Sequence, residues 1–300
     1  MRMVQLGRWA LALLAWPWAA AMADPMVTVT LLEGPTTLVR GVLRYALAEG
    51  VRLQSGDIVE VGDKSLAEME FDDGVALALG PKTRVLALSV PRGKPAPGDF
   101  YATQGTLKLA GVKQGARLRV VTPLFTLQPV EGTVVMALGG TEGSAFVEAG
   151  EARVLGPRTA GAGTAPLRLK SGDFYTGDGN KGGVAGRPSP AFIDALPKAF
   201  LDPLPSRMAR YKDRQVQPRR LEPVKYAEVE TWLKAPLEIR RRMPARFQSR
   251  AADPAFRAAL VENLRFHPEW DPILFPEKYL PKETEAAPGT AAPPRPADKR

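Results

Sequence analysis

Two neighbouring carboxylates are the first residues whose types and spacing could do chemistry. Asp72 and Asp73 stand side by side before Gly74 in the stretch MEFDDGVALALGPKTRVLAL. Adjacent residues of an extended chain point to opposite faces, so the two carboxylates do not converge on one substrate atom. An Asp-Gly pair between alternating apolar runs instead indicates a tight turn, because glycine accepts a positive φ. We therefore expect Asp72, Asp73 and Gly74 to form a structural turn between two strands.

The single histidine and a glycine-rich stretch are the next candidates. His267 lies near Glu269 and Asp271 in RFHPEWDPILFPEKY, but one histidine without any cysteine makes a poor set of zinc ligands. The apolar residues beside it, Trp270 among them, favour a packing role. GDGNKGG at residues 177–183 lacks the spacing of a phosphate-binding loop or an EF-hand. The sequence therefore predicts no catalytic residue, no metal site and no cofactor.

A run of arginines leaves two interpretations open. Arg240, Arg241 and Arg242 are consecutive, and Arg246 follows one turn later. Three consecutive residues cannot share one helix face. The run is either a solvated face or a contact for an anion or a partner. The chain has a net charge of +9 at pH 7, and outside the cytoplasm such a surface fits an acidic protein, lipid head groups or acidic polysaccharide rather than nucleic acid.

Residues 1–23 predict export. They begin with Arg2 and Arg8, continue through the apolar ALALLAW and end in Ala-Met-Ala, which is the pattern of a secretory signal. Cleavage is expected between Ala23 and Asp24. The apolar block is shorter than the roughly 20 residues that a membrane span needs, and no later segment is apolar enough to span. Because the chain has no cysteine, it is not expected to be a lipoprotein or to hold disulfides. We expect a periplasmic protein with no transmembrane span after signal removal.

The rest of the chain divides by its pattern. Residues 24–176 contain alternating apolar runs of about four to eight residues between Gly, Pro and Asp, which predicts an all-β domain. We expect a Gly-rich linker at 177–188. Residues 189–280 carry apolar residues at helical spacing with proline near the helix starts, which predicts a small helical region. The Pro/Ala-rich residues 281–300 have too few apolar side chains to bury a core and are expected to be a disordered tail.

An ordered series of motifs within residues 45–155 resembles the FecR domain family. GVRLQSGDIVEVGDKSLAEMEFDDGVALALGPKTRVLAL is similar to its first part, and GTLKLAG, ARLRVVTPLFTLQPVEGT and SAFVEAGEARVLGP follow in the family's order. The resemblance implies a twisted, solenoid-like β wrap and a binding or scaffolding role in the periplasm. The regulators of this family carry a cytoplasmic segment and a transmembrane helix before the domain, whereas a cleavable signal is expected here. We find no family resemblance after residue 190.

Three functions remain open from the sequence. The first is a non-enzymatic cell-envelope protein whose FecR-like domain binds or scaffolds another envelope protein. The second is a module that binds peptidoglycan or acidic polysaccharide through exposed aromatic and basic groups. The third is a carboxylate-based glycan hydrolase, which needs two carboxyl groups roughly 5 to 9.5 Å apart across a groove. We favour the first.

Overall fold

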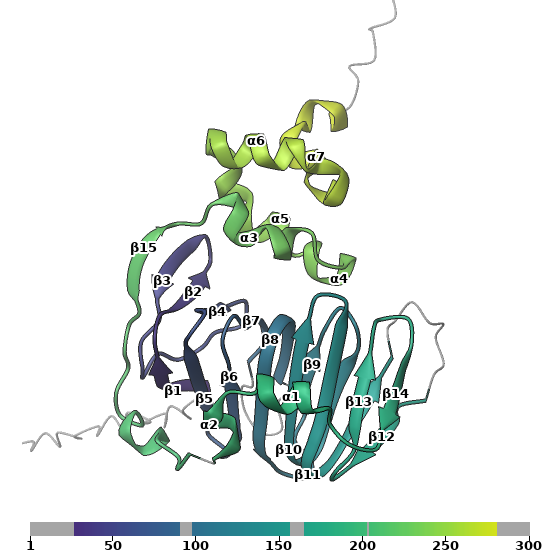
Figure 1. Cartoon of the computed structure of the whole chain (residues 1–300). Coiled ribbons are helices and arrows are strands. Elements are labelled where there is room, and N and C mark those ends of the chain that lie inside the picture. The colour runs from purple at the N-terminus through teal and green to yellow at the C-terminus, as the bar shows by residue number, and fades with distance from the viewer. Residues whose placement is uncertain (1–26, 91–97, 157–164, 203, 281–300) are drawn as a thin grey trace, which may run out of the picture.

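The described part of the chain is mainly β and ends in short helices, as the sequence predicts (Figure 1). The computed structural model describes residues 27–90, 98–156, 165–202 and 204–280. The expected signal with its cleavage site at Ala23 and Asp24, and the expected tail at 281–300, lie outside the described residues. Among the described residues, no helix has the length and apolar character needed to cross a membrane.

Three long strands hold the β part together. They are β8 (Gly98–Val112), β10 (Thr126–Gly139) and β11 (Glu142–Leu155). The shorter strands are β1 (Val27–Glu33), β2 (Thr36–Arg40), β3 (Leu43–Ala46), β4 (Ile58–Val61), β5 (Leu66–Phe71), β6 (Ala76–Leu79), β7 (Arg84–Ser89), β9 (Leu118–Val121), β12 (Leu167–Lys170), β13 (Phe174–Gly177), β14 (Gly182–Ala185) and β15 (Arg219–Pro223).

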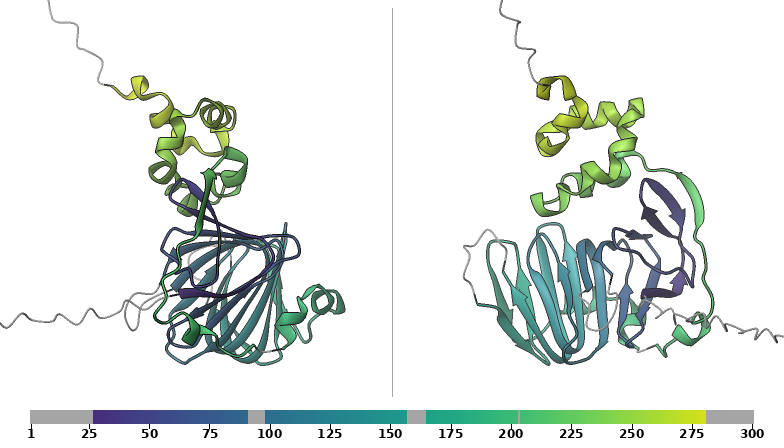
Figure 2. Two further views of the ribbon diagram at one scale, coloured as in Figure 1. Left: turned by 90° about the vertical axis from the view of Figure 1, so that its left-hand side faces the viewer. Right: turned by 180° about the vertical axis from the view of Figure 1, so that it is seen from behind.

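The strands form one continuous sheet that folds into two layers (Figure 2). The first layer has the order β1-β5-β6-β8-β10-β11-β13-β14. The second has the order β15-β3-β2-β4-β7-β8-β9-β10-β11-β12. The apolar faces of both layers meet in one core, where Phe71 of β5 and Phe100 of β8 pack edge to face with ring centroids 6.0 Å apart. One half of each long strand therefore belongs to the first layer, and the other half belongs to the second.

Glycines in the middle of the long strands allow this change of layer. Gly132 of β10 faces Gly150 of β11, with φ of +91° and +83°. The ladder between the two strands shifts register at Pro129/Glu131 and again at Thr133/Val134, on either side of this pair. The sequence predicts short strands that end at glycines; the structure instead places Gly132 at a bend within a continuous strand. The reason is that a positive φ bends a strand without ending its pairing.

Helices cover the outer face of each layer (Figure 2). Phe192, Leu196 and Phe200, from the segment of α1 and α2, pack with Leu66 and Val135 of the first layer. The later helices pack against the second layer. The helices are α1 (Pro190–Ala195), α2 (Lys198–Leu201), α3 (Tyr226–Leu233), α4 (Leu237–Arg240), α5 (Met243–Phe247), α6 (Pro254–Glu262) and α7 (Asp271–Leu274), with 3-10 turns at Met208–Arg210, Gln248–Ala252, Leu264–Phe266, Pro268–Trp270 and Pro276–Tyr279.

Two segments differ from the expected division of the chain. The linker expected at 177–188 is wrong, because β13 and β14 form an antiparallel hairpin there. Its turn is closed by Asp178, whose carboxylate accepts the backbone N–H groups of Asn180 and Lys181 at 2.9 and 2.7 Å. The region expected to be only helical contains β15, which pairs with β3 of the second layer.

Candidate functional site

The adjacent carboxylates lie in the turn between β5 and β6. Gly74 has a φ of +89°, and its N–H donates to the carbonyl of Phe71 at 2.9 Å. The carboxylate of Asp73 accepts the N–H of Val75 at 3.2 Å. The structure therefore places Asp72, Asp73 and Gly74 in a tight turn that is held by local hydrogen bonds.

The helical region meets the second layer through a buried apolar core. Trp232 of α3 is fully buried and packs edge to face on Tyr101 of β8, with ring centroids 6.1 Å apart. Val39, Ile58 and Leu86 belong to the same core. Burying side chains of this size stabilises each by about 1.5–3 kcal/mol relative to exposure. The helical region is therefore packed onto the sheet rather than tethered to it.

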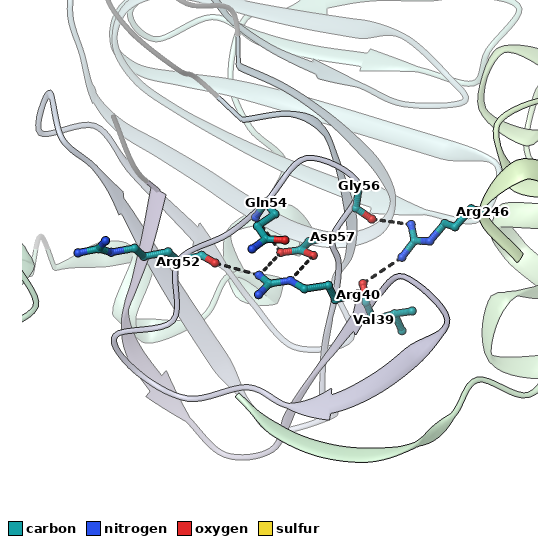
Figure 3. A network of polar contacts seen from close by, with 7 residues as sticks. All are labelled: Val39, Arg40, Arg52, Gln54, Gly56, Asp57 and Arg246. Carbon is teal, nitrogen blue, oxygen red and sulfur yellow. Dashed lines mark hydrogen bonds and ion pairs between the residues drawn. The ribbon is translucent and has the colours of Figure 1, made fainter. Parts of the chain in front are cut away.

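Arg246 of α5 connects the two parts by hydrogen bonds (Figure 3). Its guanidinium donates to the carbonyl of Gly41 at 3.1 Å, to that of Val39 at 3.0 Å and to that of Gly56. All three acceptors are neutral, and burial lowers the pKa of Arg246 to about 10, although nearby Asp57 opposes this effect. Arg246 thus remains charged at neutral pH, and within the described part of the chain no carboxylate bonds to it.

Arg40 and Asp57 form an ion pair beside Arg246 (Figure 3). The Nε and Nη2 atoms of Arg40 donate to the two carboxylate oxygens of Asp57 at 2.9 and 2.6 Å, and Nη2 also donates to the carbonyl of Arg52 at 2.9 Å. The N–H of Gln54 donates to Asp57 at 2.8 Å. Asp57 is only 1% exposed, so its charge neutralises Arg40 and is hidden from solvent.

A pocket of about 360 Å³ opens beside these groups. Three arginines line it, Arg40, Arg242 and Arg246, together with the turn around Asp57. Leu86, Leu88 and Met243 form its apolar wall. Arg242 is exposed and, among the described residues, has no hydrogen-bond acceptor or ion-pair partner. The described lining residues carry three positive charges and one negative charge, a net of +2, so the pocket can accept an anion.

The arginine run is therefore divided among several roles. Arg240 forms an ion pair with Glu269 at 2.9 Å, and Arg246 is bonded to backbone carbonyls. Arg241 and Arg242 are exposed, but only Arg242 lines the pocket. The structure does not bring the four arginines together as one surface.

His267 lies inside the helical region. It is fully buried, and its Nε2 is 3.0 Å from the hydroxyl of Tyr226. Its Nδ1 has no partner among the described residues. No group of three or more His, Asp or Glu side chains in the described ranges is placed to hold a metal. Burial lowers the pKa of His267 below its ordinary value of 6.5; Lys234 and Arg240 add to this effect, and Glu269 opposes it.

We expect the stability of the helical region to fall as the pH drops below about 6.5. The lowered pKa makes protonation of His267 less favourable in the folded state than in the unfolded state, which takes up a proton near the ordinary pKa. The unfolded state therefore binds more protons at low pH, and the lost stability returns as the pH rises. Urea unfolding at pH 7.5 and 5.5 measures the difference. His267→Gln should have a smaller pH dependence over this range; an unchanged dependence would contradict the assignment to His267.

The free edges of the sheet differ in how they are protected. β12 carries Arg168 and Lys170, and β15 carries Arg219, Arg220 and Pro223. Charged residues and proline are the usual means by which edge strands avoid further pairing. The other edge of β1 is occupied by residues 51–53, since Val29 donates to the carbonyl of Val51 at 2.9 Å. β14 ends the first layer with the sequence Gly-Gly-Val-Ala, all exposed and without charge.

The hairpin geometry shows which backbone groups of β14 face outward. The N–H of Asp178 donates to the carbonyl of Lys181 at 3.0 Å, so this pair is hydrogen-bonded. Bonded and non-bonded pairs alternate in an antiparallel ladder. Gly183 and Ala185, which lie opposite Thr176 and Phe174, therefore bond to β13. Gly182 and Val184 direct their N–H and C=O groups away from the sheet, where an added strand can pair with them.

The sequence alone does not identify Arg40, Asp57 or the open strand β14. Arg40 ends a strand directly before Gly41, and Asp57 follows Gly56, so both had a turn signal beside them. Their ion pair connects two separate turns, and no rule of sequence spacing predicts such a contact. Gly182–Ala185 has no alternation of apolar and polar residues that would mark a strand.

Fold and site together define a two-layer β protein with a packed helical region, a basic pocket at their junction and, within the described ranges, one open sheet edge. No family model matches the sequence, so membership of the FecR family is not confirmed. No curated protein matches it either.

Two solved structures, both of a candidate anti-sigma factor from Parabacteroides distasonis, are similar to part of the chain. They are 12% and 14% identical to it, with a TM-score of 0.34 in each case. Each match covers 43% of this chain and 57% of the other. The chain thus spans little more than half the length of these proteins, and so low a similarity assigns no function.

Proposed function

We propose that the protein is a non-enzymatic binding module of the cell envelope, exported to the periplasm by residues 1–23. The signal pattern, with cleavage between Ala23 and Asp24, supports export. The absence of cysteine supports a chain that is not a lipoprotein. The ordered motifs at 45–155 that resemble the FecR family support a binding or scaffolding role. The partner is an envelope protein.

The observation that carries this proposal is the unprotected edge of β14. Strand addition joins an extended segment of a partner to an exposed sheet edge, and backbone hydrogen bonds provide much of the affinity. β14 offers the N–H and C=O groups of Gly182 and Val184. Its uncharged sequence contrasts with the Arg, Lys and Pro of β12 and β15. The partner therefore contributes an extended, uncharged segment.

Val184→Pro should abolish capture of this partner while the hairpin remains folded. Proline removes the outward N–H of Val184, and it is tolerated on an edge strand at positions whose N–H faces solvent. Val184→Thr keeps the N–H and is the matched control. The chain without residues 1–23 serves as bait in an envelope extract, and captured proteins are quantified by mass spectrometry. We expect a protein that wild type and Val184→Thr retain and that Val184→Pro loses at least tenfold.

Three outcomes would contradict strand addition by a partner protein. The first is equal capture by Val184→Pro and Val184→Thr. The second is a concentration-dependent dimer that Val184→Pro abolishes, which would make a second copy of this chain the occupant of the edge. The third is sedimentation of both variants with isolated cell-wall sacculi at high salt, which would favour the polysaccharide hypothesis. Phe266, which is 42% exposed between Lys234 and Arg265, is the surface group that such binding would use.

A further inference from the structure

The pocket between the helical region and the second layer has features of a small-molecule site that the edge-strand proposal does not use. Its volume of about 360 Å³ lies in the range of ligand pockets. It lies where α5 meets the turns at Gly41 and Gly56 and the strand β7. Elements distant in the sequence therefore build it, and the packed core beneath it holds them in place.

Several N–H donors in the pocket remain unused. Arg242 has no acceptor among the described residues, so its whole guanidinium is available. The Nη1 atom of Arg40 also has none there, because Asp57 and the carbonyl of Arg52 take only Nε and Nη2. Arg246 uses each of its three nitrogens once, which leaves one hydrogen each on Nη1 and Nη2.

The charges around the pocket favour an anion. Asp57 is buried and balances Arg40, so the accessible charge comes from arginine alone. Among the residues that the structure describes, Arg246 bonds to neutral carbonyls only, and an anion nearby would offset the cost of its burial. The planar guanidinium of Arg242 matches carboxylate and phosphate alike. The apolar wall of Leu86, Leu88 and Met243 favours a carboxylate that carries an apolar group over inorganic phosphate, because inorganic phosphate has no group to place against this wall.

We propose that this pocket binds a carboxylate attached to a short apolar body, with Arg242 as its principal donor. Arg40 contributes a second donor, and Met243 and Leu88 contact the apolar part. Two sources offer this chemistry: a free small organic acid, and the terminal carboxylate of a polypeptide. The site goes beyond the edge-strand proposal and does not depend on it.

Titration of the chain without residues 1–23 with hexanoate tests the proposal by calorimetry. We expect saturable binding of hexanoate and none of hexanamide, which has the same apolar body without the charge. Arg242→Gln should weaken hexanoate binding about tenfold, the usual cost of one charge-assisted contact. Arg241 is also exposed but lies outside the pocket, so Arg241→Gln should change hexanoate binding less than twofold. Val184→Pro should bind hexanoate like wild type, which separates this site from the sheet edge.

A short peptide with a free or an amidated carboxyl-terminus identifies the source of the carboxylate. Tighter binding of the free peptide than of hexanoate would assign the site to chain ends, and the reverse would assign it to organic acids. Equal binding of the amidated and free peptides by a chain that does not bind hexanoate would overturn the proposal. So would stronger binding of inorganic phosphate than of hexanoate, or hexanoate binding that Arg242→Gln leaves unchanged.

Discussion

Gly132→Ala is expected to lower the free energy of unfolding by about 3 kcal/mol or more. The residue has a φ of +91°, a conformation that costs an L-residue roughly 1–2 kcal/mol. A Cβ there would also lie 2.0 Å from the carbonyl oxygen of Ala149, and backbone atoms cannot move aside as a flexible side chain can. The clash falls where β10 and β11 change layer, so we expect β13 and β14 to lose order with it. Urea unfolding followed by circular dichroism measures the loss.

Gly139→Ala is the matched control for this prediction. Gly139 also belongs to β10, but a Cβ there meets no atom within 4 Å, and its φ is not positive. We expect a change of less than about 0.5 kcal/mol, the range of ordinary surface substitutions. Equal stability of the two variants would show that the bend at Gly132 does not need glycine.

Arg246→Met should weaken the packing of the helical region on the second layer at a cost of about 2–4 kcal/mol. The substitution keeps a long apolar side chain but removes the donor to the carbonyls of Val39, Gly41 and Gly56. Gly41 is exposed, so its carbonyl can bond to water instead. The cost arises at Val39 and Gly56, because a buried acceptor that loses its donor costs about 1–3 kcal/mol. Removal of a buried charge offsets part of this loss. Trp232 and Trp270 are buried in the core of the helical region, so their fluorescence reports its unfolding. We expect the midpoint of the fluorescence transition to move to a urea concentration below the midpoint of the β-sheet transition.

Arg246→Lys and Arg241→Met test the geometry of this contact. Lysine keeps the charge, but its single ammonium group cannot reproduce the planar guanidinium that reaches three carbonyls, so we expect a loss close to that of Arg246→Met. Arg241 is exposed, and its replacement by Met should leave both transitions in place. Full rescue by lysine would mean that a positive charge is sufficient at this contact and that the geometry of the guanidinium is not needed.

The strand-rich part could be predicted because its apolar residues alternate in almost every run. The turn at Asp72, Asp73 and Gly74 could be predicted as well, since an Asp-Gly pair between such runs is a strong signal for a tight turn. The fusion of neighbouring runs into β10 and β11 could not. A glycine at the end of an apolar run signals a break, and only the tertiary pairing of Gly132 with Gly150 turns that break into a bend.

The candidate sites were harder to predict than the fold. The sequence reveals that Arg246 is charged, but its three acceptors are backbone carbonyls of distant turns, and every residue has such a group. Arg240 to Arg242 form one basic run in the sequence. In the structure, however, Arg240 forms an ion pair with Glu269, and of the three only Arg242 lines the pocket. β14 lacked an apolar pattern because an exposed strand at the end of a sheet buries no side chain.

Hydrogen exchange of the β14 amides, with and without the captured partner, tests directly whether the protein binds through its open sheet edge. In the free protein the N–H groups of Gly182 and Val184 face solvent and should exchange fast. We expect the partner to slow exchange of both amides at least tenfold while the amides of β12 and β15 keep their rates. Unchanged exchange at Gly182 and Val184 in a complex that protects another surface would contradict it.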